Sequence, residues 1–165
     1  MPSAMLVQVL AGAILLFLLF SLFRFAMGLR WAKVSRETAR AEVEGEGRRV
    51  VAELPLTTGE VVLLTEDERG FSWGAGSRVD KSGLVGVRMR LNGGVLAEHA
   101  REGARLPPPE PSEEYEGRER WDVAVFAADG SVTSIPCGVL REGVSREVAA
   151  TVFAAVKRAV AGKAP

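Results

Sequence analysis

Hydrophobic residues fall along the chain in two arrangements: one long block near the N-terminus, and many short alternating groups after it. Within residues 5–23 only Gln8 and Ser21 have polar side chains, and no residue is charged. At about 1.5 Å per residue, a helix of this length approaches the roughly 30 Å thickness of the hydrocarbon core of a bilayer. The block therefore predicts a transmembrane helix over residues 5–27, with a short tail at residues 1–4 before it.

A cleaved signal peptide is the alternative interpretation of this block. Such a peptide begins with basic residues, has a shorter apolar core and ends at small residues. Residues 1–4 have no charged side chain, and the block ends in Phe23-Arg24-Phe25. The pattern therefore favours a retained membrane anchor.

Basic residues flank the block on its C-terminal side only. Positively charged flanking residues are retained on the cytoplasmic side of a membrane. The chain also uses Arg far more often than Lys, which is typical of a bacterial genome rich in G and C. We therefore predict a single-pass protein of the inner (cytoplasmic) membrane, with its N-terminus outside and its C-terminal domain cytoplasmic. The flanking bases are Arg24, Arg30, Lys33, Arg36 and Arg40.

Helix-forming residues continue beyond the block. Residues 31–44 are rich in them, so the helix is expected to extend as a polar juxtamembrane stalk over residues 28–47. The sequence Gly45-Glu46-Gly47 ends this stalk. A folded domain is expected over residues 48–162.

Alternating apolar and polar residues, separated by turn residues, predict about seven short strands in this domain. Residues 61–64 are apolar on both faces and are expected inside a sheet. Asn92-Gly93 is typical of a tight hairpin, and Pro136 favours an edge position for the last strand. The predicted strands are residues 50–56, 61–64, 71–73, 85–91, 95–100, 121–127 and 132–140.

One long segment between predicted strands has a different composition. Residues 101–120 are rich in Pro and Glu and have few large apolar side chains. Such a segment buries too little surface to offset the entropy lost on ordering. We predict a flexible loop, and the alternative is a polyproline ligand for a partner.

The hydrophobic period changes near the C-terminus. Valines recur every four residues from Val148 to Val160, which predicts one amphipathic helix over residues 145–161 with Ser145 in the capping position. The predicted fold is therefore an N-terminal transmembrane helix plus an α+β, mainly β domain. In that domain about seven antiparallel strands form a bent sheet or open barrel, and the helix caps it.

This order of elements resembles that of bacterial membrane-anchored pleckstrin-homology-like (PH-like) domains. The resemblance covers residues 48–162 and includes the closing hairpin at Asp129-Gly130 and the Ile135-Pro136 strand end that leads toward the capping helix. It implies an interaction domain behind a membrane anchor. The sequence has no basic phosphoinositide-binding signature, so the resemblance assigns no residue to a lipid headgroup.

Charge and cysteine content exclude several classes of function. The 21 Lys and Arg residues balance the 21 Asp and Glu residues, so the chain is not expected to bind nucleic acid. The single cysteine excludes an internal disulfide, and it excludes zinc or iron–sulfur sites built from several thiolates.

His99 and Cys137 are the candidates for chemistry, but each lacks the neighbours that a catalytic site needs. His99 follows Glu98, yet adjacent strand residues point to opposite faces. The two side chains are therefore expected to diverge rather than to share a metal ion or a proton. Cys137 has no histidine near it in the sequence and is expected to be a small buried thiol.

Two further patterns also lack specificity. Residues 74–77 share only their glycines with a phosphate-binding loop. The acidic residues at positions 66–68 and Asp80 do not have the spacing of a calcium loop. We therefore predict no catalytic, cofactor or metal site and no small-molecule substrate.

Arg88 and Arg90 are the candidate contact residues. We expect them side by side on the outer face of the strand at residues 85–91, whose inner face is apolar. Paired arginines are suited to an acidic partner or a lipid phosphate. The alternative is a solvated face with no partner.

These features predict a single-pass membrane-anchored, non-enzymatic interaction module. Its PH-like cytoplasmic domain is expected to bind a membrane-associated protein partner next to the lipid bilayer. The alternative is a small accessory or assembly subunit of a membrane protein complex, because Gly12 and Ala13 permit close helix packing. A third hypothesis is an enzyme that acts on a lipid or envelope substrate through His99 or Cys137.

Overall fold

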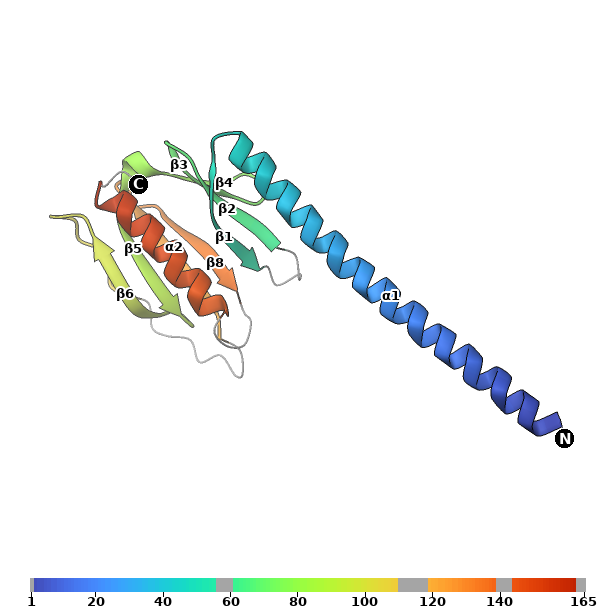
Figure 1. Ribbon diagram of the computed structural model, residues 1–165. Helices are drawn as coiled ribbons and strands as arrows, with labels where there is room; N and C mark the ends of the chain where they lie inside the picture. The colour runs from blue at the N-terminus through green and yellow to red at the C-terminus, as the bar shows by residue number, and fades with distance from the viewer. Residues whose placement is uncertain (1, 56–60, 110–118, 139–143, 163–165) are drawn as a thin grey trace. The chain divides into compact units, whose positions relative to one another are not determined.

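A computed structural model describes residues 2–55, 61–109, 119–138 and 144–162 of the chain. The chain divides into two compact units, Met1–Glu42 and Val43–Pro165, and each is described by itself. Figure 1 shows one long helix in the first unit and a mainly β domain in the second.

Helix α1 (Pro2–Gly45) includes the predicted transmembrane segment and residues 28–45 of the predicted stalk. Between Ile14 and Phe25 its side chains are exposed, and all but Ser21 and Arg24 are apolar. Among the side chains that the structure describes, no helix combines the length and the apolar character needed to cross a membrane.

Backbone hydrogen bonds cap the C-terminal end of α1. Gly47 has a φ of 75°, and its N–H donates to the carbonyl of Glu44 at 3.0 Å. The N–H of Arg48 donates to the carbonyl of Val43 at 3.2 Å. This pair of bonds is a Schellman motif, in which a left-handed glycine satisfies the last carbonyls of a helix. The predicted break after Gly45 is confirmed.

The described residues of the domain form eight antiparallel strands in two four-stranded sheets, which pack against the C-terminal helix α2 (Val144–Val160) (Figure 1). The first sheet has the order β1-β2-β3-β4 and the second the order β6-β5-β7-β8. The strands are β1 (Arg49–Pro55), β2 (Val61–Glu66), β3 (Gly70–Trp73), β4 (Ser77–Asp80), β5 (Leu84–Leu91), β6 (Gly94–Ala100), β7 (Trp121–Ala127) and β8 (Val132–Gly138).

The structure corrects the predicted strand count. Seven strands were expected, and the additional one is β4, which contains a single apolar residue, Val79. Pairing with β3 positions β4, since Val79 lies opposite Phe71 and is buried with it. A short 3-10 helix (Lys81–Gly83) then leads into β5. Leu56 and residues 139–140 of the predicted strands lie outside the described residues.

Other predictions for the strands are confirmed. Strand β2 lies inside its sheet and β8, with Pro136, lies at an edge. The hairpin between β5 and β6 has φ values of 50° at Asn92 and 81° at Gly93, as a two-residue turn of this type requires.

Helix α2 supplies one side of the core. Val152, Val156 and Val160 are at most 1% exposed, and the helix packs against β5, β1, β7 and β8. The predicted four-residue period is confirmed. Ser145 is buried inside the first turn rather than placed before it, because the helix begins at Val144.

The segment between β6 and β7 is held at both ends. The N–H of Arg101 donates to the carbonyl of Val85 at 2.8 Å. Arg120 and Asn92 exchange two bonds: Asn92 N–H donates to the Arg120 carbonyl at 2.9 Å, and Arg120 N–H donates to Asn92 Oδ1 at 2.8 Å.

The first half of this segment also packs on the second sheet. A Cβ atom on Gly86 would overlap the side chain of Leu106, so Leu106 lies against the bare backbone of β5. Residues 110–118 of the predicted flexible loop lie outside the described residues.

Candidate functional site

Arg88, a predicted contact residue, lies on the face of β5 opposite the core but is only 6% exposed. Its guanidinium forms an ion pair with Glu98 on β6 and donates to the carbonyl of Pro107 at 2.5 Å. The same group lies 5.0 Å from the centre of the Phe126 ring, which is a cation–π distance. The alternative of a solvated face therefore does not apply to Arg88, whose side chain is covered by partners within the domain.

Arg90, the second predicted contact residue, also has partners inside the domain. It forms an ion pair with Asp122 on β7 and donates to Ser134 Oγ on β8 at 2.7 Å. Asp122 is only 4% exposed and accepts a further hydrogen bond from Ser134 Oγ at 3.2 Å. These contacts tie three neighbouring strands together, and the two arginines stabilise the sheet.

The structure separates His99 from Cys137. They lie on β6 and β8, the two outer strands of the second sheet, with β5 and β7 between them. Three strand spacings of about 4.8 Å each keep an imidazole on one edge from activating a thiol on the other. The expected divergence of Glu98 and His99 is confirmed, since Glu98 binds Arg88 on the outer face and His99 lies opposite the core residue Val87.

Cys137 is fully buried, as predicted. Burial, and then the charge of Asp122, raise the pKa of its thiol to about 12. Its Sγ lies 3.4 Å from the carbonyl oxygen of Ile135, to which it donates. A thiol in this state is not a nucleophile near neutral pH.

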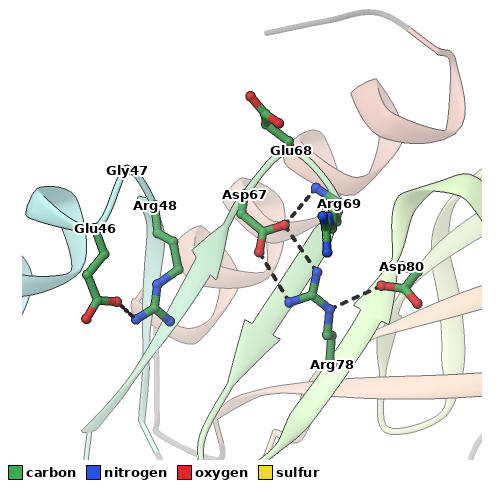
Figure 2. Close-up of a pocket in the computed structure, with 8 residues that line it drawn as sticks. All are labelled: Glu46, Gly47, Arg48, Asp67, Glu68, Arg69, Arg78 and Asp80. Carbon is green, nitrogen blue, oxygen red and sulfur yellow. Dashed lines mark hydrogen bonds and ion pairs between the residues drawn. The ribbon is translucent and has the colours of Figure 1, made fainter.

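One concave feature of the described domain is a charged pocket of about 740 Å³ (Figure 2). Three segments form it: the residues that follow α1, the turn between β2 and β3, and strand β4. Three of its acidic residues, Asp67, Glu68 and Asp80, belong to the weak cation pattern seen in the sequence, whereas no sequence pattern marked its arginines. The lining residues are Glu46, Gly47, Arg48, Asp67, Glu68, Arg69, Arg78 and Asp80.

Asp67 organises the turn that forms one wall of this charged pocket. Its Oδ1 accepts the backbone N–H groups of Arg69 at 2.8 Å and Gly70 at 2.6 Å, and its Oδ2 accepts Arg78 Nη1 at 3.2 Å. Burial alone would raise the pKa of Asp67, but the amides of Gly70 and Arg69 and the charge of Arg78 hold it below its usual value.

Arg78 reaches across the charged pocket from β4. Its Nε donates to Asp80 Oδ1 at 3.1 Å, and its two terminal nitrogens face Asp67 (Figure 2). The hydrogen bond to Asp80 and the charge of Asp67 raise the pKa of Arg78 above its usual value. The carboxylate of Asp67 and the guanidinium of Arg78 therefore both remain charged across the physiological pH range.

Glu66 connects the charged pocket to the core. It forms ion pairs with Arg49 and, at 2.9 Å, with Lys81, whose Nζ also donates to the Asp67 carbonyl at 2.6 Å. Burial would raise the pKa of Glu66, but the hydrogen bonds from Arg49 and Lys81 lower it below its usual value. Glu66, Arg49 and Lys81 thus form an ionic network next to the residues that line the charged pocket.

This arrangement favours electrostatic recognition over proton transfer. A general acid or base works best with a pKa near neutral, whereas the pKa values of Asp67 and Arg78 move away from neutral. Within the part of the chain that the structure describes, the side chains of Glu68 and Arg69 form no hydrogen bond or ion pair, and no cluster of His, Cys, Asp and Glu is arranged for a metal ion.

Comparison with protein-family models, with curated proteins and with solved structures finds no match to this chain.

Proposed function

We propose that this protein is a membrane-anchored, non-enzymatic interaction module, with α1 as its single-pass anchor and the β domain as its binding part. The observation that carries the proposal is the apolar surface of α1. Five consecutive side chains are each more than half exposed: Leu15, Leu16, Phe17, Leu18 and Leu19.

Consecutive helical residues point about 100° apart, so five of them cover the whole circumference of α1. A helix at a water interface needs a polar face. This part of α1 has none, and it therefore requires apolar surroundings on every side, which lipid provides. The uncharged block extends over residues 5–23 in the sequence, with Arg24 directly after it.

The two sheets and α2 support a PH-like fold for the β domain, the finer part of this proposal. Eight strands replace the seven expected, and β4 is the additional one. The basic residues that follow the apolar block support a cytoplasmic position for this domain in the inner membrane. A membrane-associated protein is the proposed partner.

Arg88 and Arg90 have a limited place in this proposal. Each is engaged by a carboxylate of the domain, so a partner that uses them must displace Glu98 or Asp122. Glu68 and Arg69 of the charged pocket form no ion pair with the described residues, so a partner can contact them without displacing a carboxylate of the domain.

Cell fractionation tests the anchor. The full chain should pellet with membranes and resist extraction by alkaline carbonate. Leu16→Asp with Leu19→Asp should release it, because two carboxylates inside the bilayer are costly. The matched control is Ala39→Asp with Ala41→Asp, two exposed positions later in α1, which should stay in the membrane. A soluble wild-type chain would overturn the proposal.

Protease protection tests the orientation. With a tag at the C-terminus, the β domain should be digested in inverted membrane vesicles and protected in spheroplasts. Digestion in spheroplasts would place the domain outside the cytoplasm and contradict the proposed orientation.

The all-round apolar helix is also compatible with an accessory subunit whose helix contacts other helices in a membrane complex. Replacing residues 5–27 by an unrelated apolar helix separates the two functions. An interaction module should keep its cellular function after this exchange, whereas an accessory subunit should lose it.

A further inference from the structure

A second hollow lies between β1 and α2, in a part of the domain that the charged pocket does not reach. This β1–α2 groove has a volume of about 490 Å³. It is lined by Arg49, Val50, Val51, Ala150, Thr151, Ala154, Ala155 and Arg158.

One wall of the β1–α2 groove is an open strand edge. Among the described strands, β1 has only β2 as a hydrogen-bonded neighbour. The pairing register with β2 shifts between Val50 and Ala52, so Val51 has no partner there. Such a bulge re-aims the local backbone. An edge strand presents N–H and C=O groups on which another strand can pair.

The open part of this edge is its first half. At the other end of β1 the backbone of β8 comes close, since a Cβ atom on Gly138 would lie 2.8 Å from Pro55 Cγ. Proline also lacks the N–H needed for pairing. The segment from Arg49 to Val51 therefore borders the groove, while the segment near Pro55 is closed.

The opposite wall of the β1–α2 groove has small side chains. Ala150, Thr151, Ala154 and Ala155 form this side of α2, and only Ala155 among them is fully buried. These residues leave space for short apolar side chains from an added strand. A bulky residue in their place would fill the groove.

Two arginines add a charge preference. Arg49 is paired with Glu66 yet its side chain is 51% exposed, and Arg158 is exposed with no ion pair among the described residues. A carboxylate complements this pair of guanidinium groups. A second copy of the chain would instead bring two further arginines into the same groove, and like charges oppose such pairing.

We propose that the β1–α2 groove binds an extended peptide segment of a partner protein as an added strand on β1. Short apolar side chains of the peptide lie against α2, and an Asp or Glu of the peptide lies between Arg49 and Arg158. This inference rests on the proposed function, because it names the chemistry of the partner that the interaction module recognises.

Phage-displayed random octapeptides selected on the full chain in detergent micelles test the proposal. The expected consensus combines small or β-branched residues with one acidic residue. The dissociation constant of the enriched peptide, labelled with fluorescein, is then measured by fluorescence anisotropy. Hydrogen exchange should show new protection of backbone amides in the segment from Arg49 to Val51 when the peptide is bound.

Variants of the groove give the decisive comparison. Arg158→Glu should weaken the peptide about tenfold or more, and a peptide with Lys in place of its acidic residue should restore binding to that variant. Lys157→Glu, the same charge reversal one position away and outside the lining, should change affinity less than about twofold. Ala154→Phe should remove binding by filling the groove. Circular dichroism checks that every variant is folded.

Three results would overturn the proposal: no enriched sequence, an enriched sequence without an acidic residue, or binding that Arg158→Glu and Ala154→Phe leave unchanged. Self-association lost in these two variants would assign the groove to a second copy and would also overturn it. Membrane fractionation of the same variants measures their membrane anchoring independently of peptide binding. No enriched peptide, or peptide binding that these variants leave unchanged, together with intact anchoring therefore contradicts only this inference.

Discussion

Leu106 occupies the space that a side chain on Gly86 would need. A Cβ atom on Gly86 would lie 2.7 Å from Leu106 Cδ1 and closer still to its Cδ2. Gly86→Ala is therefore expected to push Leu106 away from β5 and to lower the free energy of unfolding by about 1 kcal/mol, because partly buried apolar surface is lost. Urea denaturation followed by tryptophan fluorescence measures this change.

Two controls make this prediction specific. Gly83→Ala should have little effect, because no described atom lies within 4 Å of a Cβ atom at that position. In a Leu106→Ala background, the Gly86→Ala exchange should cost almost nothing. Equal losses for Gly83→Ala and Gly86→Ala would contradict the predicted contact.

Glu66 should make the domain sensitive to acid. Its pKa lies below the ordinary value of 4.5 in the folded state, so its ionised form stabilises the fold fully above about pH 4.5. This contribution is lost as the pH falls through the lowered folded-state pKa. Glu66→Gln should reduce stability at pH 7 by about 1 to 2 kcal/mol and should weaken the loss below pH 4.5.

Chemical denaturation at a series of pH values measures the effect of Glu66→Gln. Glu68→Gln is the matched control, since Glu68 is exposed and forms no ion pair with the residues that the structure describes. Its pH profile should follow that of the wild type. Parallel profiles for Glu66→Gln and the wild type would refute the role of Glu66.

Arg90 and Asp122 should be strongly coupled. Removing one partner leaves the other charge almost buried without its main ion pair, which costs more than removing both. Arg90→Ala and Asp122→Ala should each cost about 2 to 4 kcal/mol, and the double variant should be about 2 kcal/mol more stable than additivity predicts.

A double-mutant cycle in urea gives this coupling directly. The pair of Arg78 and Asp80 serves as the exposed comparison, and its cycle should show little coupling because solvent screens it. Additive effects at Arg90 and Asp122 would show that the ion pair does not stabilise the sheet.

Cys137 should be unreactive in the folded protein. It is buried and its pKa is raised to about 12, so the thiolate is scarce at pH 8. Alkylation by iodoacetamide at pH 8 should be at least about a hundredfold slower than in the urea-unfolded chain. Mass spectrometry gives the extent of modification, since this is the only cysteine. Equal rates in the two states would contradict the buried position.

Elements whose side chains alternate or repeat against the core were predictable from sequence. Phe71 and Trp73 share the buried face of β3, and the valines of α2 keep their four-residue period. Strand β4 was not predictable, because three of its four residues are polar and pairing with β3 decides its conformation. A local pattern does not contain such long-range pairing.

The environments of the charged residues were the least predictable part of the site. The alternation of apolar and polar residues along β5 correctly placed Arg88 and Arg90 on the face opposite the core. It did not indicate that both side chains are largely covered by other residues of the domain. Their partners Glu98 and Asp122 are 10 and 32 positions away in sequence, and only the folded sheet brings them close. The charged pocket has the same origin, since Arg78 on β4 contacts Asp67 in the turn between β2 and β3.

The two anchored ends of the segment between β6 and β7 give this domain an internal site at which another sequence can be inserted. Arg101 is fixed to Val85, and Arg120 is fixed to Asn92, so the strands on either side do not depend on the length of chain that joins them. The entropy of closing a loop grows only slowly with its length. A reporter inserted between these ends would label the domain while both termini stay native.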